Sequence, residues 1–509
     1  MSDKRTTIRS RWLLIFLLTA MTAFFLTACG SKDIPENKVF SIDDLDGKTI
    51  GVQLGTTGDI YISDYEGDEA GTKVERYNKG ADAINSLKQG KLDCVVIDEQ
   101  PAKAFVRENP ELMILEEEFT LEYYAAVIAK GNEELLDKVN QALKELDADG
   151  TLRKIKQNYI PDEESGETIP FTYEQEVTSG PKLLMATNAQ FPPYEFYEEG
   201  QIVGIDVEIA RAIADKLGMV LEIVDMEFDA IINAVSSGKA DIGLAGFTVT
   251  EEREKQINFS KSYTVSKQVI VVRNNDAIRS SGDLWEKLYN NFVKEGRWKY
   301  LLKGLGNTLL ITLVAIILGL ILGFLIAEVR VHHDKNGTFK FLNAIAKIYV
   351  TIIRGTPMMV QLLIIYFVIF QSVNISKILV AIIAFGLNSA AYLSEVIRSG
   401  IMSIDPGQFE AGRSLGLSFK VMMRSVILPQ ALKNVLPAIG NEFIALLKET
   451  SIAGYIGLMD LTKGGDIIRS ITYEPLIPLL SVALIYLILV MGLSFLVSRL
   501  ERRMKKNER

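Results

Sequence analysis

The first half of the chain alternates short apolar runs with stretches of helical periodicity. Six apolar runs predict buried strands at residues 48–55, 93–98, 123–130, 182–188, 240–246 and 268–272. One amphipathic segment between them has apolar residues at Ile205, Ile209, Ala212, Ile213 and Leu217, the spacing of a helix laid on a sheet. This alternation, from about residue 38 to 275, predicts α/β lobes with a largely parallel sheet. Ligands of such folds bind beyond the carboxyl ends of the strands.

The second half of the chain has the pattern of a membrane domain. Five apolar runs fall at residues 307–328, 345–371, 376–397, 431–448 and 475–498. Each is near the roughly 20 residues that a helix needs to cross a bilayer. Lys and Arg gather in the loops after the first and third runs and in the C-terminal tail. This bias predicts an all-α domain of five spans over residues 305–509, with the preceding segment outside the cell and the C-terminus in the cytoplasm.

The N-terminus has the features of a bacterial export signal. A basic head over residues 4–11 precedes an apolar run that ends in the sequence LTAC at residues 26–29. These last residues resemble the lipobox, which implies removal of residues 1–28 and attachment of a diacylglycerol to the thiol of Cys29. The alternative is an uncleaved spanning helix with a chance cysteine.

Composition narrows the class of protein further. The chain has 509 residues, enough for two or three units, and 48% hydrophobic with 23% charged residues is too apolar for a disordered chain. A net charge of −9 argues against nucleic acid as a partner. Two cysteines and two histidines suit neither a disulfide framework nor an ordinary zinc site, so no metal and no cofactor are expected.

Two pairs of segments carry a family resemblance. Residues 183–218 and 226–263 closely resemble the first lobe of extracellular binding proteins for polar amino acids, and residues 42–62 and 91–102 resemble the second lobe. The resemblance implies a two-lobed, periplasmic-binding-protein-like α/β domain whose second lobe comes first in the chain. The expected order is second lobe (38–160), polar linker (161–180), first lobe (181–276) and connector (277–304).

This reversed order predicts a circular permutation. Such a rearrangement is tolerable because the termini of compact domains often lie close together and a short linker can join them. The alternative is a pair of truncated binding domains that are completed by another subunit.

The resemblance also implies an amino-acid site. Arg253 falls where the family binds the ligand carboxylate, which a guanidinium matches with two parallel hydrogen bonds, and Asp98 falls where the family binds the ammonium group. The other positions supply backbone groups, hydroxyls, aromatic walls and the contact to the ligand's side chain; they are Gly246, Thr248, Phe191, Phe228, Asn188, Thr57 and Gly58.

The identity of the amino acid depends on fewer residues. Asn188 stands where some members carry an aspartate that meets a cationic or amide side chain, and asparagine removes that charge. We therefore expect a glutamine-like, glutamate-like or neutral polar ligand, with arginine and lysine as alternatives. Structural interpretations also exist: Arg253 as a solvated charge, Asp98 as a helix cap and Phe228 as a core residue.

A second motif lies in the loop after the third apolar run. Glu410, Ala411, Gly412 and Gly416, followed by VILP at residues 426–429, resemble the EAA loop of ABC importer permeases. In that family, a short helix turned at the last glycine docks on a separate ATPase. Nothing in the chain fits G-x-x-x-x-G-K-[ST]. The resemblance thus implies a non-enzymatic permease that needs an ATP-hydrolysing partner and a second permease unit. We expect that unit to be a second copy of this chain, with a related permease as the alternative.

Three polar residues fall inside predicted spans: Glu442, Asn441 and Glu395. Such residues are costly in lipid, so they indicate a transmembrane substrate path or a contact between helices. Taken with the motifs, the sequence predicts a permease subunit with a built-in extracellular receptor, part of an importer for polar amino acids in a bacterial plasma membrane. A ligand-gated channel or sensor built on the same binding fold is the alternative.

Overall fold

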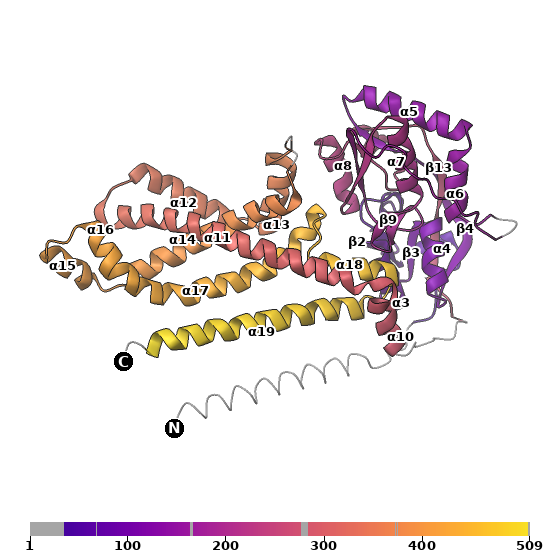
Figure 1. The fold of residues 1–509 in the computed structure, drawn as a ribbon. Coiled ribbons are helices and arrows are strands. Elements are labelled where there is room, and N and C mark those ends of the chain that lie inside the picture. Colours follow the sequence, from indigo (N-terminus) through magenta and orange to yellow (C-terminus); the bar gives the residue numbers. More distant parts are fainter. Residues whose placement is uncertain are drawn as a thin grey trace.

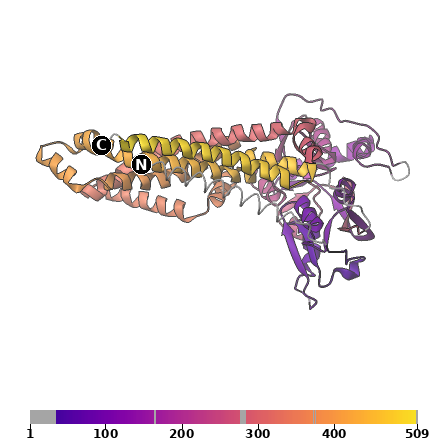
Figure 2. The ribbon, with the colours of Figure 1, turned by 90° about the horizontal axis from the view of Figure 1, so that it is seen from below.

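The computed structural model describes residues 35–67, 69–162, 166–275, 284–371, 373 and 375–506. The predicted signal peptide (1–28) and Cys29 lie outside the described residues. An α/β domain stands at one end of an elongated bundle of helices (Figure 1). The view from below shows the same arrangement, with the C-terminus near the end of the bundle that is far from the α/β domain (Figure 2).

The first lobe of the α/β domain, called lobe A here, is built on a five-stranded sheet in the order β2-β1-β3-β13-β4. Strands β1, β2 and β3 are parallel, and β13 runs antiparallel between β3 and β4. The strands are β1 (Thr49–Gln53), β2 (Lys73–Tyr77), β3 (Cys94–Asp98), β4 (Leu112–Tyr124) and β13 (Thr264–Arg273). Helices α2 (Thr57–Ser63), α3 (Gly80–Lys88) and α4 (Glu99–Glu108) connect them.

The other lobe, lobe B, has a second five-stranded sheet in the order β10-β6-β11-β5-β12. Its strands are β5 (Val127–Ala129), β6 (Lys182–Thr187), β10 (Val220–Asp225), β11 (Ile242–Gly243) and β12 (Ile257–Phe259). Its helices are α5 (Glu133–Ala148), α6 (Thr151–Tyr159), α7 (Ile205–Lys216), α8 (Phe228–Ser236) and α9 (Glu251–Glu254). A small sheet of β7 (Gln190–Phe191), β8 (Glu195–Glu198) and β9 (Gln201–Val203) belongs to the same part of the chain.

The chain crosses between the lobes twice, and this corrects the predicted lobe ranges. It passes from β4 into β5 near residue 125 and returns from β12 into β13 near residue 262. Strand β5 and helices α5 and α6 therefore lie with lobe B, although the range 38–160 assigned them to the other lobe. Strand β13 completes the sheet of lobe A, although the range 181–276 assigned it to lobe B. The predicted ranges failed because sequence order alone does not reveal which sheet a crossing strand joins.

The described part of the predicted linker, residues 161–162 and 166–180, runs along the surface of lobe B without helix or strand. Its backbone N–H groups donate to side chains of that lobe, from Phe171 to Asn158 (3.0 Å), from Tyr173 to Glu208 (3.2 Å) and from Val177 to Asp215 (2.9 Å). These bonds satisfy backbone donors that would otherwise depend on water alone. The linker is thus fixed against α7 and its neighbours.

The helical bundle begins earlier in the chain than the predicted residue 305. After α10 (Leu284–Leu288), the long α11 runs over Trp298–Asn336. The remaining helices are α12 (Lys340–Gly355), α13 (Met358–Ile364), α14 (Lys377–Met402), α15 (Pro406–Ser414), α16 (Phe419–Met422), α17 (Leu428–Glu449), α18 (Leu461–Thr472) and α19 (Leu476–Lys506). Gly319 and Gly323 of α11 lie against Ser389 and Leu393 of α14, and such small residues let two helices approach closely.

Three helices of the described chain are long and apolar enough to cross a membrane: α11, α14 and α19. The run predicted at 345–371 is instead a pair of helical segments, Lys340–Gly355 and Met358–Ile369, bent by 109°, which would bring the number to four if the pair is one span. The run at 431–448 is helical, as α17, but does not meet the same test. Polar residues lower the apolarity of this run; they are Lys433, Asn434, Asn441, Glu442 and Lys448. By length and composition, the described structure therefore gives fewer than the five predicted spans.

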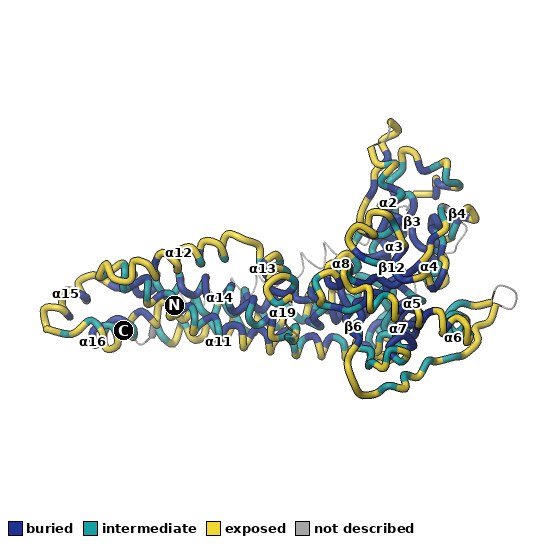
Figure 3. Tube along the Cα trace, turned by 90° about the horizontal axis from the view of Figure 1, so that it is seen from above, coloured by how far each residue is buried: buried dark blue, intermediate teal, exposed yellow. Residues whose placement is uncertain are grey.

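Burial differs sharply between the two parts of the chain. Dark, buried segments fill the interiors of both lobes, whereas the outer faces of the long helices are exposed (Figure 3). Many of the exposed residues are large and apolar, including Leu313, Ile317 and Ile321 on α11 and Leu484 and Ile488 on α19. Continuous apolar exposure of this kind marks a surface that is covered by lipid or by a partner.

Candidate functional site

A small cavity of about 10 Å³, close to the room of one water molecule, lies between the two lobes. Residues of lobe A close one side of it and residues of lobe B close the other. Seven of the nine predicted ligand residues line it: Thr57, Asp98, Asn188, Phe191, Phe228, Gly246 and Arg253. The other lining residues are Gln53, which takes the place of a lysine of some glutamine binders, and Thr56, Glu195 and Ala245. Thr248 and Gly58 lie just behind this lining.

Arg253 reaches across the cavity from lobe B. Its helix, α9, begins at Thr250, whose hydroxyl accepts from the Arg253 backbone N–H. The guanidinium donates to the carbonyl oxygen of Thr248 (2.9 Å) and to that of Gly55 in lobe A (2.7 Å). The side chain is only 7% exposed, so burial lowers the pKa of Arg253 from its ordinary value. Arg253 is therefore a buried cation in the cleft and not the solvated charge of the structural interpretation.

Asp98 faces the same cavity from the end of β3. It is 4% exposed, and the Tyr124 hydroxyl donates to its carboxylate. Burial, and then the nearby charge of Glu122, raises the pKa of Asp98 to about 7. Its side chain makes no cap bond to α4, which disfavours the helix-cap interpretation. A buried carboxylate opposite a buried guanidinium is the arrangement that a zwitterion requires.

Glu122 belongs to this site, although sequence reasoning missed it. It lies on β4, is 1% exposed, and accepts hydrogen bonds from the Thr248 hydroxyl (2.8 Å) and the Gln268 amide (3.2 Å). The same Gln268 amide nitrogen lies 3.3 Å from the Thr57 hydroxyl. The network links both lobes at their crossing strands. Its signal in the sequence was weak because Glu122 follows a run of acidic residues that resembles an exposed surface.

Gly246 supplies a backbone position that no other residue could fill. Its φ of 58° is in the left-handed region, and an added Cβ would meet the rings of Phe191 and Tyr124. Its N–H donates to the carboxylate of Asp206 (2.9 Å), which also accepts from the Tyr263 hydroxyl (2.7 Å). Burial raises the pKa of Asp206 to about 7.

Glu195 is the second acid that the sequence did not reveal. It lies at the start of β8, lines the cavity and is fully buried. Neither of its carboxylate oxygens accepts a hydrogen bond from any residue that the structure describes. Burial, and then the neighbouring Asp206, raises the pKa of Glu195 well above its usual range. The raised pKa favours the neutral carboxyl group, which can donate one hydrogen bond to a ligand that enters the cavity and accept others from it.

Aromatic rings and an amide complete the lining on the side of lobe B. Phe191 stacks on Tyr194 with ring centroids 5.6 Å apart, and Phe228 stacks on Phe247 at 4.7 Å. The Phe228 and Phe247 rings also lie 5.8 and 5.4 Å from the Arg253 guanidinium. The Asn188 amide donates to the carbonyl oxygen of Met226 (2.8 Å), which fixes its orientation.

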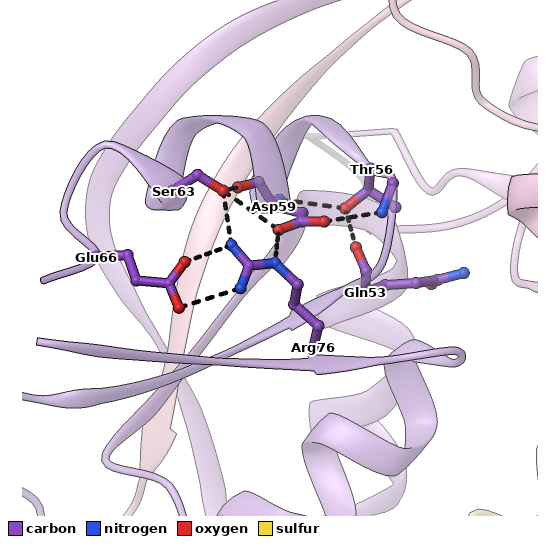
Figure 4. A network of polar contacts seen from close by, with 7 residues as sticks. Gln53, Thr56, Asp59, Ser63, Glu66 and Arg76 are labelled. Carbon is purple, nitrogen blue, oxygen red and sulfur yellow. Dashed lines mark hydrogen bonds and ion pairs between the residues drawn. The ribbon is translucent and has the colours of Figure 1, made fainter.

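On the side of lobe A, the loop before α2 is held by a network of charges (Figure 4). Asp59 accepts from the Gly55 N–H (2.9 Å) and from Arg76 (2.7 Å), and Arg76 also pairs with Glu66. The Thr56 hydroxyl donates to the carbonyl oxygen of Gln53 (2.7 Å). These contacts set the position of the Gly55 carbonyl that meets Arg253. Gly58 leaves room for the Gln268 side chain, since an added Cβ would lie 3.0 Å from its amide oxygen.

The predicted coupling loop lies at the end of the bundle that is remote from the α/β domain (Figure 1). Glu410 and Ala411 are exposed on α15, whereas Gly412 is buried against Met422. The helix ends in a Schellman motif, in which the Leu417 N–H donates to the Gly412 carbonyl oxygen (3.0 Å) and Gly416 adopts a φ of 73°. Leu415 is 79% exposed at this turn.

The three polar residues of the predicted spans do not lie together in the structure. Glu442 lies 3.4 Å from the Ser389 hydroxyl, between α14 and α17, while Asn441 is exposed. Glu395 instead forms ion pairs with Arg330 and Arg398. The structure therefore brings Glu442 and Glu395 into different surroundings, and Glu395 acts as a contact between helices.

The α/β domain is a two-lobed binding domain, because it has two five-stranded lobes, two chain crossings between them and a cavity between them. A helical membrane part follows it in the chain. The family described as "Bacterial extracellular solute-binding proteins, family 3" matches residues 40–162 and 183–443. The chain belongs to that family, and it joins a domain of this kind to a permease of the amino-acid ABC transporter type.

The permease assignment comes from named relatives. Over 211 residues the chain is 42% identical to "Arginine transport system permease protein ArtQ" of Bacillus subtilis (strain 168), which spans 41% of this chain and 94% of that protein. It is 38% identical over 208 residues to "Glutamine transport system permease protein GlnP" of Escherichia coli (strain K12), with 40% and 93% covered. A solved "amino acid ABC transporter with histidines" is 40% identical and covers 44% of this chain and all of that one, with a TM-score of 0.40. Relatives of this class are transporter subunits and not enzymes.

Proposed function

We propose that the cavity binds an amino acid and that the chain delivers it to its own permease, as part of an ATP-driven importer. The observation that carries the proposal is the buried pair of opposite charges, Arg253 in lobe B and Asp98 in lobe A, on facing sides of one cavity. The Arg253 guanidinium would bind the α-carboxylate in place of the Gly55 carbonyl oxygen. Asp98 would bind the α-ammonium, together with the Gly246 carbonyl and the Thr248 hydroxyl.

The side chain of the ligand would meet an acidic end of the cavity. Glu195 has two free acceptor oxygens there, and the Asn188 amide nitrogen is already occupied. This favours a side chain that donates hydrogen bonds, and a cation most of all, because a bound cation would lower the raised pKa of Glu195 and compensate the carboxylate that forms. We therefore place arginine first and glutamine second. Glutamate, which the sequence alone admitted, is disfavoured because its carboxylate would face Glu195.

The relatives support the same two candidates. One is named for arginine transport and another for glutamine transport. The ligand would bridge the lobes and favour their closed arrangement, because only that state makes both sets of contacts. Glu442, between α14 and α17, would then meet the amino acid on its way through the membrane.

We further propose the arrangement of the complete transporter. Two copies of this chain would form the pore, with the binding domains outside the cell and the C-termini inside. Five spans per chain would include the bent pair and α17. An ATP-hydrolysing subunit would dock on the exposed face around Glu410, Ala411 and Leu415. The binding domain would be one circularly permuted unit, which is supported by the two complete five-stranded sheets.

Calorimetry on the full chain in lipid nanodiscs tests the proposal. L-arginine, L-lysine, L-glutamine and L-glutamate are titrated separately, with D-arginine as the control for the α-carbon geometry. We expect binding of L-arginine at micromolar or lower concentration, weaker binding of L-glutamine and none of L-glutamate. If none of the L-amino acids binds, the proposed function is wrong.

A further inference from the structure

A groove in the membrane part opens beside the predicted coupling loop, at the end of the bundle that is remote from the α/β domain (Figure 1). Its volume is about 550 Å³, many times the room that one water molecule needs. The walls come from α11, from the end of α14 and from the segment between α16 and the start of α17. Most of the lining is apolar: Phe324, Val331, Ile397, Ile401, Met423 and Leu428.

The groove lies on the same side of α11 as a stripe of exposed apolar residues. This stripe consists of Leu313, Ile317 and Ile321. Phe324 and Glu328, which line the groove, continue the spacing of three and four residues toward the end of the helix. Residues spaced in this way share one face of a helix. An acyl chain of the bilayer that lies along this face of α11 therefore leads directly into the groove.

The rim of the groove has charges that are not neutralised within the described part of the chain. Lys420 and Arg424 lie four residues apart, on successive turns, and Glu328 lies on α11. All three residues are exposed, and none forms an ion pair with another residue that the structure describes. Apolar walls below two unpaired cations complement a molecule that joins an acyl chain to an anionic group.

We propose that the groove binds one anionic phospholipid of the cytoplasmic leaflet. An acyl chain would lie against Phe324 and Ile401, and the phosphate would lie between Lys420 and Arg424, because Lys and Arg at the cytoplasmic membrane surface attract anionic head groups. Glu328 would accept a hydrogen bond from a hydroxyl of the head group, which favours phosphatidylglycerol. The choice of leaflet rests on the proposed function, which places this end of the bundle in the cytoplasm.

The depth of the groove in the membrane favours a lipid over a soluble partner. Phe324 lies within the apolar run 307–328, and Ile397 is the last residue of the run 376–397, so the lining reaches the level of the hydrocarbon. A soluble ATPase subunit would instead meet the exposed turn at Leu415, which lies outside both runs.

The groove also borders the segment that supports the coupling loop. Met423 of its lining follows Met422, which is 1% exposed and packs against Gly412 of α15. Phe419, another residue of the lining, packs against the ring of His332 on α11 with centroids 4.6 Å apart. A lipid in the groove would therefore stabilise the segment on which α15 rests. The phospholipid thus becomes part of the surface that presents the coupling loop.

Native mass spectrometry of the full chain tests the site. The chain is reconstituted in nanodiscs of phosphatidylcholine and phosphatidylglycerol, released into detergent, and the retained lipids are counted. The parent chain should retain phosphatidylglycerol, and the double variant Lys420→Gln, Arg424→Gln should retain about tenfold less, because both contacts to the phosphate are lost. Thermal unfolding of the variant checks its fold. Equal retention of phosphatidylglycerol by the parent chain and this variant would overturn the proposal.

A matched control uses two cations at the same end of the bundle. Arg499→Gln with Arg503→Gln removes two exposed charges of the same spacing from α19, which does not line the groove. This control should retain as much phosphatidylglycerol as the parent chain. A loss as large as that of the groove variant would show attraction to the membrane surface in general, and it would contradict a specific site.

Photo-cross-linking identifies what fills the groove. Met423→p-benzoylphenylalanine is introduced in the full chain, which is illuminated in the same nanodiscs with and without the ATPase subunit. Adducts with phospholipid are expected. Adducts with a second copy of the chain or with the ATPase subunit in place of lipid would exclude the proposed occupant. Lipid retention and the lipid adduct are both measured without amino acid or ATP, so a failure of the proposed function leaves them as decisive as before.

Discussion

The guanidinium of Arg253 in lobe B donates to the backbone carbonyl of Gly55 in lobe A at 2.7 Å, across the cavity that separates the lobes. The Arg253 side chain thus has two roles: it holds the lobes together in this structure, and among the described residues that line the cavity it alone carries a guanidinium. The Gly55 carbonyl occupies a place that a ligand carboxylate would compete for.

Arg253→Ala is expected to abolish amino-acid binding and leave the fold intact. The variant removes the bidentate partner of the α-carboxylate and leaves that charge without a match, a loss on the order of 100-fold in affinity or more. Calorimetry with L-arginine measures the affinity, and the thermal unfolding of the receptor reports its fold. Lys255→Ala, which changes an exposed charge two residues away, is the control. Unchanged affinity would remove Arg253 from the site.

Glu195→Gln is expected to change the preference for arginine over glutamine more than the affinity for amino acids as a group. The substitution keeps the shape of the side chain but removes the acid that a bound guanidinium would ionise, so arginine should lose about tenfold relative to glutamine. Competition of the two amino acids for the full chain gives the ratio directly. Glu198→Gln lies on the same strand but is exposed, and it should leave the ratio as it was. A constant ratio in Glu195→Gln would place the ligand's side chain elsewhere.

The residues of the site differ in how far the sequence could reveal them. Arg253, Asp98 and Gly246 follow recognisable motifs, and the structure brings them to one cavity. Glu122 and Glu195 were missed because their importance comes from burial, and each lies beside other acids in the sequence that are exposed. No periodicity distinguishes a buried acid from a solvated one until the crossing of the strands is known.

Affinity should depend on pH through Asp98. Its pKa of about 7 in the ligand-free structure is raised by burial and by Glu122, and a bound ammonium would favour the carboxylate form. Binding therefore releases a proton below pH 7, and affinity should fall by up to about tenfold for each unit of acidification. Titrations in two buffers of different ionisation enthalpy measure the released proton. A constant affinity between about pH 5.5 and 8 would contradict the assignment of Asp98.

The free energy of unfolding of the receptor should change with pH in the direction opposite to the ligand affinity. Asp98 and Asp206 have pKa values raised from the ordinary 3.8 to about 7, so the folded state holds protons that the unfolded state releases. The contribution of these two groups to the free energy of unfolding therefore decreases as pH rises from about 4 to about 7. Saturating L-arginine should weaken this dependence, because the ligand compensates Asp98.

Leu415→Asp is expected to uncouple the transporter from its ATPase. The side chain is an exposed apolar residue at the turn after α15, where a partner surface would cover it, and a charge there opposes that contact. Amino-acid-stimulated hydrolysis should fall by about tenfold, and L-arginine affinity should stay the same. Leu415→Met keeps the apolar volume and serves as the matched control. Full stimulation in Leu415→Asp would exclude this turn as the contact.

The membrane part shows a different limit of sequence interpretation. The runs at 307–328, 376–397 and 475–498 were recognised from length and apolarity, and they correspond to α11, α14 and α19. The run at 345–371 is continuous in hydropathy yet bends by 109° near Pro357, because proline disfavours helical backbone in the residue before it. Its sequence therefore shows that a break occurs but not how large the bend is.

The covalent link between the receptor and α11 has a consequence for the cell. In the proposed transporter, every pore is synthesised with its own receptor, so the number of these built-in capture sites follows the number of transporters. An organism that meets a scarce nutrient would have to make more of the whole protein to collect more of it. In that transporter, capture by the built-in receptor and uptake through the pore are thus set by one level of gene expression.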